Sequence, residues 1–245
     1  MYPVLQVGSL AIAVPGLALL IGVWVALELA EREAARLTLN PDAVYRLAFS
    51  ALVAGLIGAR LAYVARYLSV YASDPLGIFS LNAATLAPAE GALIGVTAAF
   101  IYGARRQLPL RATLDALAPA LAALAVAVAV AHAASGDAFG APAQLPWSVY
   151  LWGEYRHPAQ VYELIAALGV LGLGWRVRAR GLFPGFNFLL VAALSAAARI
   201  FLEAFRGDSL LIAGGWRAAQ VVGLVVLAVC LAAMRYWSRE AAQTR

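Results

Sequence analysis

The chain has little charge and contains no lysine. Only 13% of its 245 residues are charged, against about 25% in an average soluble domain, and all 18 basic residues are arginine. Hydrophobic residues make up 64% of the chain, and the mean hydropathy is +0.82. A water-soluble fold of this length could not bury so much apolar surface, so the composition predicts an integral membrane protein.

Other absences exclude further classes of protein. A single cysteine, Cys230, excludes an internal disulfide and a thiolate metal cluster, and we predict no metal site. Without lysine no retinal Schiff base can form, which excludes a seven-helix retinal protein. The net charge of +5 is not gathered in basic runs between exposed aromatic residues, so no nucleic-acid partner is expected. No basic region precedes the first apolar stretch, which predicts a retained helix and not a cleaved signal peptide.

Seven apolar stretches are long enough to cross a bilayer as helices. They are residues 10–30, 44–68, 89–104, 114–134, 159–177, 183–205 and 218–236. The alternating run AVAVAVA at 125–131 resembles a strand, but lipid requires backbone hydrogen bonds within the segment, which predicts helix. We therefore predict an all-α polytopic membrane protein whose residues 1–245 form a single transmembrane helical domain.

The distribution of arginine predicts the orientation. Twelve arginines follow the first, third, fifth and seventh stretches, whereas four lie on the opposite side of the membrane. Because cytoplasmic loops carry an excess of basic residues, the side with twelve is predicted to be cytoplasmic. An odd number of spans then places the N-terminus outside and the C-terminus in the cytoplasm.

Ionisable residues inside the apolar stretches cost about 2.5–3.5 kcal/mol each at the bilayer centre, so each needs a reason. They are Arg60, Glu90, His132, Glu163, Arg199 and Glu203. At a rise of about 1.5 Å per residue, all six lie within roughly 12 Å of the outer surface. Helical spacing also places Arg199, Glu203 and Arg206 on one face. We expect such faces to converge on one polar pocket open to the outer leaflet.

Two interpretations of these charges remain open. They could be buried arginine–glutamate pairs that fix the register of the helices. Alternatively, they could bind an anion, because guanidinium groups match phosphate oxygens in two-point hydrogen bonds. In the outer half of a membrane, the abundant phosphate belongs to phospholipid headgroups. A transporter would normally hold its charges near the midplane, so their position on one side argues against transport.

Several segments resemble motifs of the prolipoprotein diacylglyceryl transferase family. The segments GARLAYVARY (58–67) and EGALIGV (90–96) are similar to the family's second and third helices. RHPAQVYE (156–163) is close to the motif R-H-P-[SA]-Q-x-Y-E, and RIFLEAFR (199–206) matches R-x-x-x-E-x-x-R. The resemblance implies a multi-pass enzyme of the bacterial cytoplasmic membrane, where membrane lipid surrounds it. Such enzymes move the diacylglyceryl group of phosphatidylglycerol onto the lipobox cysteine of prolipoprotein signal peptides, without a cofactor.

The resemblance also implies roles for individual residues. Arg60, Arg199 and Arg206 would bind or neutralise the phosphate headgroup, and Glu203 would orient these arginines. We expect Arg199 and Glu203 to be catalytic, together with His132, for which the reason is given below. The expected substrate-binding residues are Arg60, Tyr63, Glu90, Asp137, Arg156, His157, Gln160, Tyr162, Glu163 and Arg206.

The chain also departs from the family's patterns. The signature R-x-G-N-x-x-N-G-E has Ala129 in place of its arginine, His132 for its first asparagine and Asp137 for its glutamate. Glu90 stands where the family has the histidine of H-G-G. His132 lies about one helical turn beyond Ala129, so we hypothesise that it supplies a polar or basic group. The alternative is a non-catalytic homologue that binds anionic phospholipid or a lipoprotein precursor.

Overall fold

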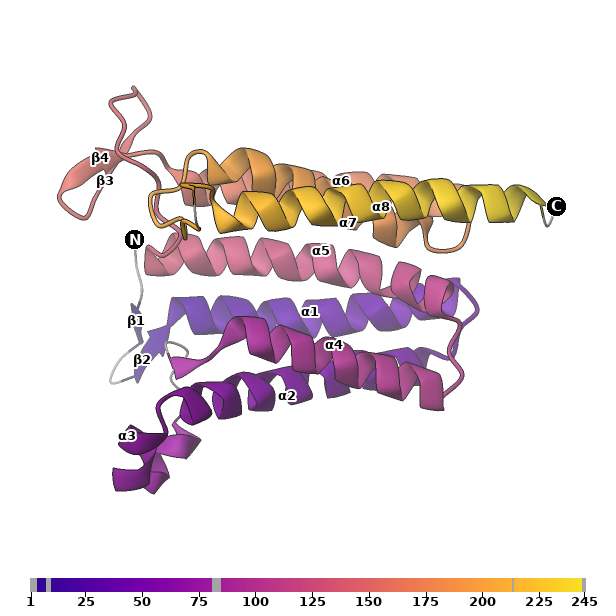
Figure 1. The fold of residues 1–245 in the computed structure, drawn as a ribbon, viewed down its shortest axis with the longest axis horizontal. Helices are drawn as coiled ribbons and strands as arrows, with labels where there is room; N and C mark the ends of the chain where they lie inside the picture. The colour runs from indigo at the N-terminus through magenta and orange to yellow at the C-terminus, as the bar shows by residue number, and fades with distance from the viewer. Residues whose placement is uncertain (1–3, 8–9, 81–84, 213, 244–245) are drawn as a thin grey trace.

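The structure, a computed structural model, describes residues 4–7, 10–80, 85–212 and 214–243, and it is built from long helices that run side by side (Figure 1). The long helices are α1 (Val14–Arg36), α2 (Pro41–Arg66), α4 (Pro88–Arg105), α5 (Leu110–Ser135), α6 (Ala159–Val177), α7 (Phe186–Glu203) and α8 (Ala218–Gln243). The all-helical prediction is confirmed, and the ambiguous run at 125–131 lies inside α5, as predicted.

Most of the short elements gather at one end of the bundle, which we call the hairpin end (Figure 1). They are the antiparallel pairs β1 (Val4–Val7) with β2 (Leu10–Ala13) and β3 (Val149–Leu151) with β4 (Glu154–Arg156), and the helices α3 (Leu68–Ser73) and η1 (Pro75–Phe79). A further 3-10 turn, η3 (Arg178–Arg180), follows α6. The C-terminal end of α8 lies at the opposite end of the bundle (Figure 1).

The first predicted span is wrong at both ends. Residues 10–13 pair with β1, and the helix begins at Val14, where Pro15 favours a first turn because its φ is already fixed. The helix then continues to Arg36, six residues beyond the predicted end at residue 30. The last helix also continues further than predicted, to Gln243 instead of residue 236. The other predicted bounds are closer, and those of α6 agree at both ends.

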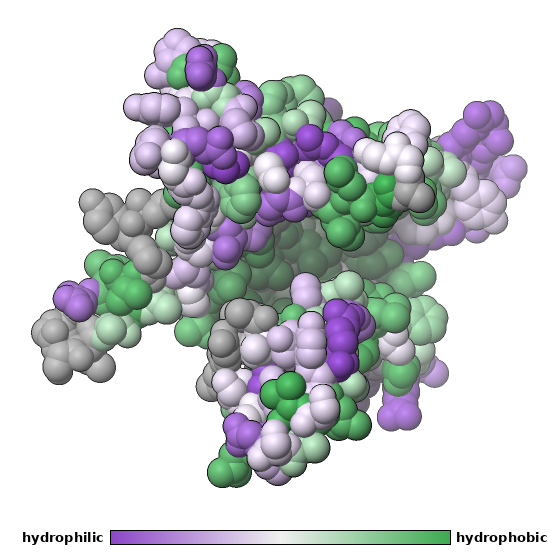
Figure 2. Space-filling model, turned by 60° about the vertical axis from the view of Figure 1, so that its left-hand side comes forward, coloured by the Kyte–Doolittle hydropathy of each residue, from purple (hydrophilic) through white to green (hydrophobic). Residues whose placement is uncertain are grey.

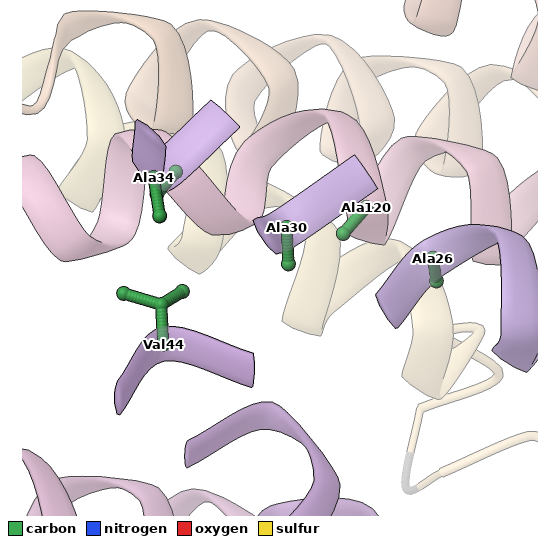
Figure 3. Close-up of a cluster of buried hydrophobic side chains, with 6 residues drawn as sticks. Ala26, Ala30, Ala34, Val44 and Ala120 are labelled. Carbon is green, nitrogen blue, oxygen red and sulfur yellow. The ribbon is translucent and has the colours of Figure 1, made fainter. Parts of the chain in front are cut away.

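Helix α5 lies in the middle of the bundle and packs against α1, α6 and α7. The pair α2 and α4 lies on one side of this layer, and α8 packs on α7 at the other side (Figure 1). Alanines fill the contact between α1 and α5: Ala30, Ala34 and Ala116 are fully buried, and Val44 of α2 packs on the same cluster (Figure 3). Such small side chains let helix backbones approach closely, which replaces the hydrophobic driving force that lipid cannot supply.

Glycines set the contact between α2 and α4. A Cβ at Gly91 would lie 2.6 Å from the Cβ of Ala59 and 2.7 Å from the carbonyl oxygen of Gly55. One turn later, a Cβ at Gly95 would lie 2.8 Å from the carbonyl oxygen of Ala51. The segment Gly91–Gly95 is thus a small-xxx-small contact of the kind that joins membrane helices.

We expect Gly91→Ala to lower the free energy of unfolding by about 1–3 kcal/mol, because the two backbones must separate to admit a methyl group. Gly169→Ala in α6 is the matched control, since a Cβ there meets no heavy atom within 4 Å. Denaturant titration of the purified protein in mild detergent would measure both. Equal stability of the two variants would show that α2 and α4 do not pack through Gly91.

The end opposite the hairpin end holds two polar contacts between distant segments. The carboxylate of Asp115, in α5, accepts hydrogen bonds from the backbone amides of Gly185 (2.6 Å) and Phe188 (3.0 Å) and thereby caps α7. In α1, Glu33 is 2% exposed and pairs with Arg36 (2.6 Å) and with Arg178 of η3 (2.7 Å). Buried charge therefore occurs at this end of the bundle as well, at Glu33.

Five of the long helices are long and apolar enough to cross a membrane, namely α1, α2, α5, α7 and α8. The other two, α4 and α6, have 18 and 19 residues and run alongside them (Figure 1). Large apolar side chains are exposed on the outside of the bundle, among them Leu20, Trp24, Leu93 and Val222. Exposed apolar surface of this extent fits lipid as the surrounding solvent.

Candidate active site

A histidine–carboxylate pair joins α5 and α6 at the hairpin end. His132 lies in the last turn of α5, which ends at Ser135. The next residue, Gly136, has φ of 87°, and its amide donates to the carbonyl oxygen of His132. The Nδ1 atom of His132 lies 2.9 Å from Oε2 of Glu163, which is near the start of α6. Both side chains are partly buried, so this hydrogen bond orients the imidazole.

A second charged group lies at the end of α7. Arg199 and Glu203 form an ion pair, with 3.0 Å between Nη2 and Oε2, and Nε of Arg206 lies 4.0 Å from the same oxygen. The side chain of Glu203 is 1% exposed, whereas that of Arg199 is 39% exposed. The expected helical face is only partly present, because α7 ends at Glu203 and Arg206 lies beyond it. The arginines nevertheless lie beside one buried carboxylate.

Two partners of this group were not predicted from the sequence. Asp208 binds Arg206 in two-point fashion, at 2.9 Å and 2.7 Å, and Arg217 donates to the carbonyl oxygens of Glu203 and Arg206 and to Ser209. Burial lowers the pKa of Arg206, but the hydrogen bond and charge of Asp208, followed by the charges of Glu163 and Glu203, outweigh it and raise that pKa above its ordinary value. In the sequence, the close spacing R-x-D at 206–208 was a feature from which a pair between Arg206 and Asp208 could have been predicted.

A cavity of about 120 Å³ connects the two groups. Its charged lining residues are Glu163, Arg199 and Arg206, and most of the remainder are small or apolar side chains from α5, α6 and α7, including Ala125, Ala166 and Leu202. The cavity can hold several waters, so it has room for a phosphate group beside the arginines.

The loop between α5 and α6 is fastened to this site through backbone atoms. Gln160 is buried and donates to the carbonyl oxygen of Asp137 (3.0 Å). The side chain of Asp137 is exposed and does not line the cavity. Arg156 donates to the carbonyl oxygens of Gly140 and Leu151, pairs with Glu154 and lies over the ring of Phe139. These contacts fix the loop and leave Arg156 few donors for a substrate.

Aromatic rings continue this packing towards the end of α7. The ring of His157 lies 5.2 Å from that of Phe205 and 6.2 Å from that of Tyr162, and the hydroxyl of Tyr162 accepts from Trp147 (2.8 Å). The Nδ1 atom of His157 is buried without a hydrogen-bond partner among the described residues. The motif RHPAQVYE therefore spans the loop, the aromatic cluster and the pair with His132.

The remaining predicted residues form a separate cluster on α2 and α4. The guanidinium of Arg60 donates to the carbonyl oxygens of Gly77 (2.5 Å), Ile78 (2.8 Å) and Thr85 (2.8 Å). Glu90 pairs with Arg66, and the ring of Tyr63 packs on that of Tyr67. The structure therefore brings His132, Glu163, Arg199, Glu203 and Arg206 together, and it places Arg60, Tyr63 and Glu90 elsewhere at the hairpin end. A phosphate role for Arg60 stays a prediction, and it would require these backbone hydrogen bonds to open.

The similarity to known proteins identifies the family of this chain. A family model described as prolipoprotein diacylglyceryl transferase matches residues 3–236. The chain belongs to the prolipoprotein diacylglyceryl transferase family. This confirms the resemblance seen in the motifs and makes the chain a member of a transferase family.

Similar proteins named phosphatidylglycerol–prolipoprotein diacylglyceryl transferase occur in several bacteria. One from Synechococcus elongatus is 32% identical over 243 residues, which cover 91% of this chain and 82% of that protein. One from a Nostoc species is 31% identical over 252 residues, covering 96% and 88%. One from Clostridioides difficile is 28% identical over 212 residues, covering 86% and 85%. The similarity thus extends over most of each protein.

Within the prolipoprotein diacylglyceryl transferase family, the resemblance in the motifs placed Ala129 of this chain opposite an arginine of the signature. Ala129 is 0% exposed, and it lies on α5 one turn before His132. An arginine would not fit such a closely packed position without displacing neighbouring helices. One turn later on α5, His132 forms a polar pair with Glu163 of α6.

A hollow separates the two polar clusters of this family member. Figure 2 brings the hairpin end forward and shows the hollow between the part that contains α6, α7 and α8 and the part that contains α2 and α4. The side chains visible deep inside it are mostly hydrophobic. Among the described residues, no group of three histidine, cysteine or acidic side chains is placed to hold a metal ion.

Proposed function

We propose that this chain transfers the diacylglyceryl group of phosphatidylglycerol to the lipobox cysteine thiol of prolipoproteins at the outer leaflet of the bacterial cytoplasmic membrane. In this proposal all seven long helices cross the membrane, and the hairpin end faces outward. The arginine distribution supports that orientation. Family membership and the names of the relatives support the substrates.

The proposed reaction is a displacement at the carbon of the diacylated glycerol that is bonded to the phosphate oxygen. The cysteine sulfur forms a bond to this carbon as the bond between the carbon and the phosphate oxygen breaks. The products are a thioether and glycerol phosphate, and the thiol proton passes to a base on the protein. No oxidant, reductant or metal is needed for the atoms and charges to balance.

We assign the base to His132. When Glu163 is ionised, its carboxylate can only accept a hydrogen bond, so Nδ1 of His132 carries the proton in their 2.9 Å contact. The other ring nitrogen, Nε2, then holds the lone pair that can take the proton from the thiol. Glu163 thus acts as a positioning residue that sets the tautomer of the base.

We assign the phosphate to Arg199. Arg206 is already held by Asp208 in two-point fashion, whereas Arg199 is partly exposed, lines the cavity and makes a single ion pair with Glu203. The numbers of positive and negative side chains in this region are equal: they are Arg199, Arg206 and Arg217, and Glu163, Glu203 and Asp208. An incoming phosphate therefore binds by competing with Glu203 for Arg199. The guanidinium of Arg199 then lies where negative charge develops on the leaving group.

The observation that carries the proposal is the cavity that holds Arg199 and Glu163 together, because it puts a phosphate-binding group beside the carboxylate that orients the base. Complementation tests it directly. The chain is expressed in a bacterium depleted of its own diacylglyceryl transferase, with Arg199→Gln as the matched variant, and lipid attachment to a reporter lipoprotein is followed by mass spectrometry.

We expect rescue by the unaltered chain and none by Arg199→Gln at equal levels of membrane-inserted protein. Absence of rescue by the unaltered chain, when it is inserted at normal levels, would contradict the transferase assignment. It would then favour the alternative of a homologue that binds anionic phospholipid or a lipoprotein precursor without reacting.

A further inference from the structure

A groove lies between α1 and α6 at the end opposite the proposed transfer site. Both helices pack on α5 but make little contact with each other. The groove has a volume of about 740 Å³ and is lined by Leu29 of α1 and by Leu168, Gly169, Leu171, Gly172, Leu173, Trp175 and Arg176 of α6. This volume lies within the range of about 300–1,000 Å³ that is typical of small-molecule sites.

Two glycines keep the groove open. Gly169 and Gly172 lie three residues apart on one face of α6, and a Cβ at either would meet no heavy atom within 4 Å. The glycines between α2 and α4 behave differently, since a Cβ at Gly91 would collide with α2. In α6 the missing side chains therefore leave space and do not bring a second backbone closer.

In the last turn of α6, this face carries Arg176, an arginine that forms no ion pair with the described residues. Arg176 follows Gly169 by seven residues and Gly172 by four, and it lines the groove where α6 ends. No carboxylate of the described residues lies within ion-pair distance of Arg176, although Glu33 binds the nearby Arg36 and Arg178. An apolar groove with an unpaired arginine at its mouth is complementary to an acyl chain joined to an anionic headgroup.

The wall beside this arginine is held in place. The guanidinium of Arg178 lies 3.3 Å from the centre of the Trp175 ring, and Arg178 is itself fixed by Glu33 at 2.7 Å. Glu33 also holds Arg36, whose guanidinium donates to the carbonyl oxygen of Arg178 (3.2 Å). The buried Glu33 therefore joins the end of α1 to the start of η3 and fixes the tryptophan that borders the groove.

We propose that this groove binds an anionic phospholipid of the leaflet opposite the transfer site, with an acyl chain along Leu29 and Gly172 and the headgroup phosphate on Arg176. Along α6, Arg176 is 13 residues from Glu163, which is about 20 Å at 1.5 Å per residue. The lipid bound here is therefore distinct from a lipid that reacts beside His132. It fills the space between α1 and α6 and stabilises the bundle against separation of these helices.

Photo-crosslinking tests the proposal without any measurement of transfer. The purified chain in nanodiscs is exposed to phosphatidylglycerol or phosphatidylcholine that carries a diazirine on one acyl chain, and labelled peptides are mapped by mass spectrometry. We expect phosphatidylglycerol to label residues 168–176 in preference to phosphatidylcholine. Arg176→Gln should reduce this labelling about fivefold, because one arginine near a membrane surface contributes about 1 kcal/mol towards an anionic lipid.

Two further variants sharpen the result. Gly172→Leu fills the groove and should remove labelling by both lipids, while Arg235→Gln, at an exposed arginine of α8 near the same end, should leave it unchanged. Equal labelling by the two lipids, or labelling of α6 that Arg176→Gln does not alter, would overturn the proposal. Because the readout is the position of the label, this outcome is independent of whether the chain is a transferase.

Discussion

Replacing His132 by alanine is expected to lower the rate of diacylglyceryl transfer by about 100-fold or more, since a positioned general base contributes about 10²–10⁴-fold. The reason is that Nε2 of His132 is the proposed acceptor of the thiol proton, with Nδ1 held by Glu163 at 2.9 Å. The measurement is the initial rate with phosphatidylglycerol and a synthetic lipobox peptide, in detergent micelles, at saturating concentrations of both.

A double-mutant cycle separates this role from a structural one. If Glu163 acts through His132, the variant His132→Ala with Glu163→Gln should be no slower than His132→Ala alone, because effects within one catalytic unit are not additive. Ser135→Ala, in the same last turn of α5, is the matched control and should keep near-normal activity. A rate for His132→Ala within about threefold of the unaltered chain would remove His132 from the chemistry.

Gly140→Ala is expected to have the second large effect, on both stability and transfer. A Cβ at Gly140 would lie 2.1 Å from the carbonyl oxygen of His157 and 2.7 Å from its Cβ. Gly140 is also bridged to Arg206, and its carbonyl oxygen accepts from Arg156 (3.1 Å). The parts of the loop around Gly140 and His157 must move apart, which should lower the free energy of unfolding by about 1–3 kcal/mol. A shift of about 1 Å at the site should slow transfer about 100-fold.

Gly153→Ala provides the contrast within the same loop. Gly153 has φ of 88°, so alanine is strained there by about 1–2 kcal/mol, but its Cβ would meet no heavy atom within 4 Å. We expect Gly153→Ala to keep its transfer rate and only Gly140→Ala to lose it. Limited proteolysis between α5 and α6 would report whether the loop has come away. Normal transfer by Gly140→Ala would show that the loop does not position the site.

The helices were largely predictable because lipid leaves the backbone few alternatives. The bounds of α6 follow from its apolar run alone, and the alternating segment at 125–131 had to be helical to satisfy its own hydrogen bonds. The first span was predicted less well. Hydropathy does not distinguish an apolar strand at 10–13 from the start of a helix, nor does it reveal that Glu33 continues α1 as a buried residue.

The residues of the candidate site were predictable as types, but their partners were not. His132 and Glu163 are 31 positions apart, and their contact depends on how α5 and α6 rotate against each other, which helical spacing within one segment does not contain. Arg60 illustrates the converse. Its position suggested a phosphate ligand, whereas its guanidinium is occupied by the backbone carbonyl oxygens of Gly77, Ile78 and Thr85. No periodic pattern in the sequence predicts these contacts.

The cap that Asp115 provides for α7 bears on the order in which the protein is assembled. The accepting carboxylate belongs to Asp115 of α5. The amides that it binds belong to Gly185 and Phe188, which emerge from the ribosome about 70 residues later. Until then, the carboxylate of Asp115 must remain solvated at the membrane surface, since an unpaired polar group in lipid is costly. Docking of α7 is thus the step that allows this end of α5 to lose water, so biogenesis should pass through an intermediate in which the first helices are inserted and α5 is still loosely seated.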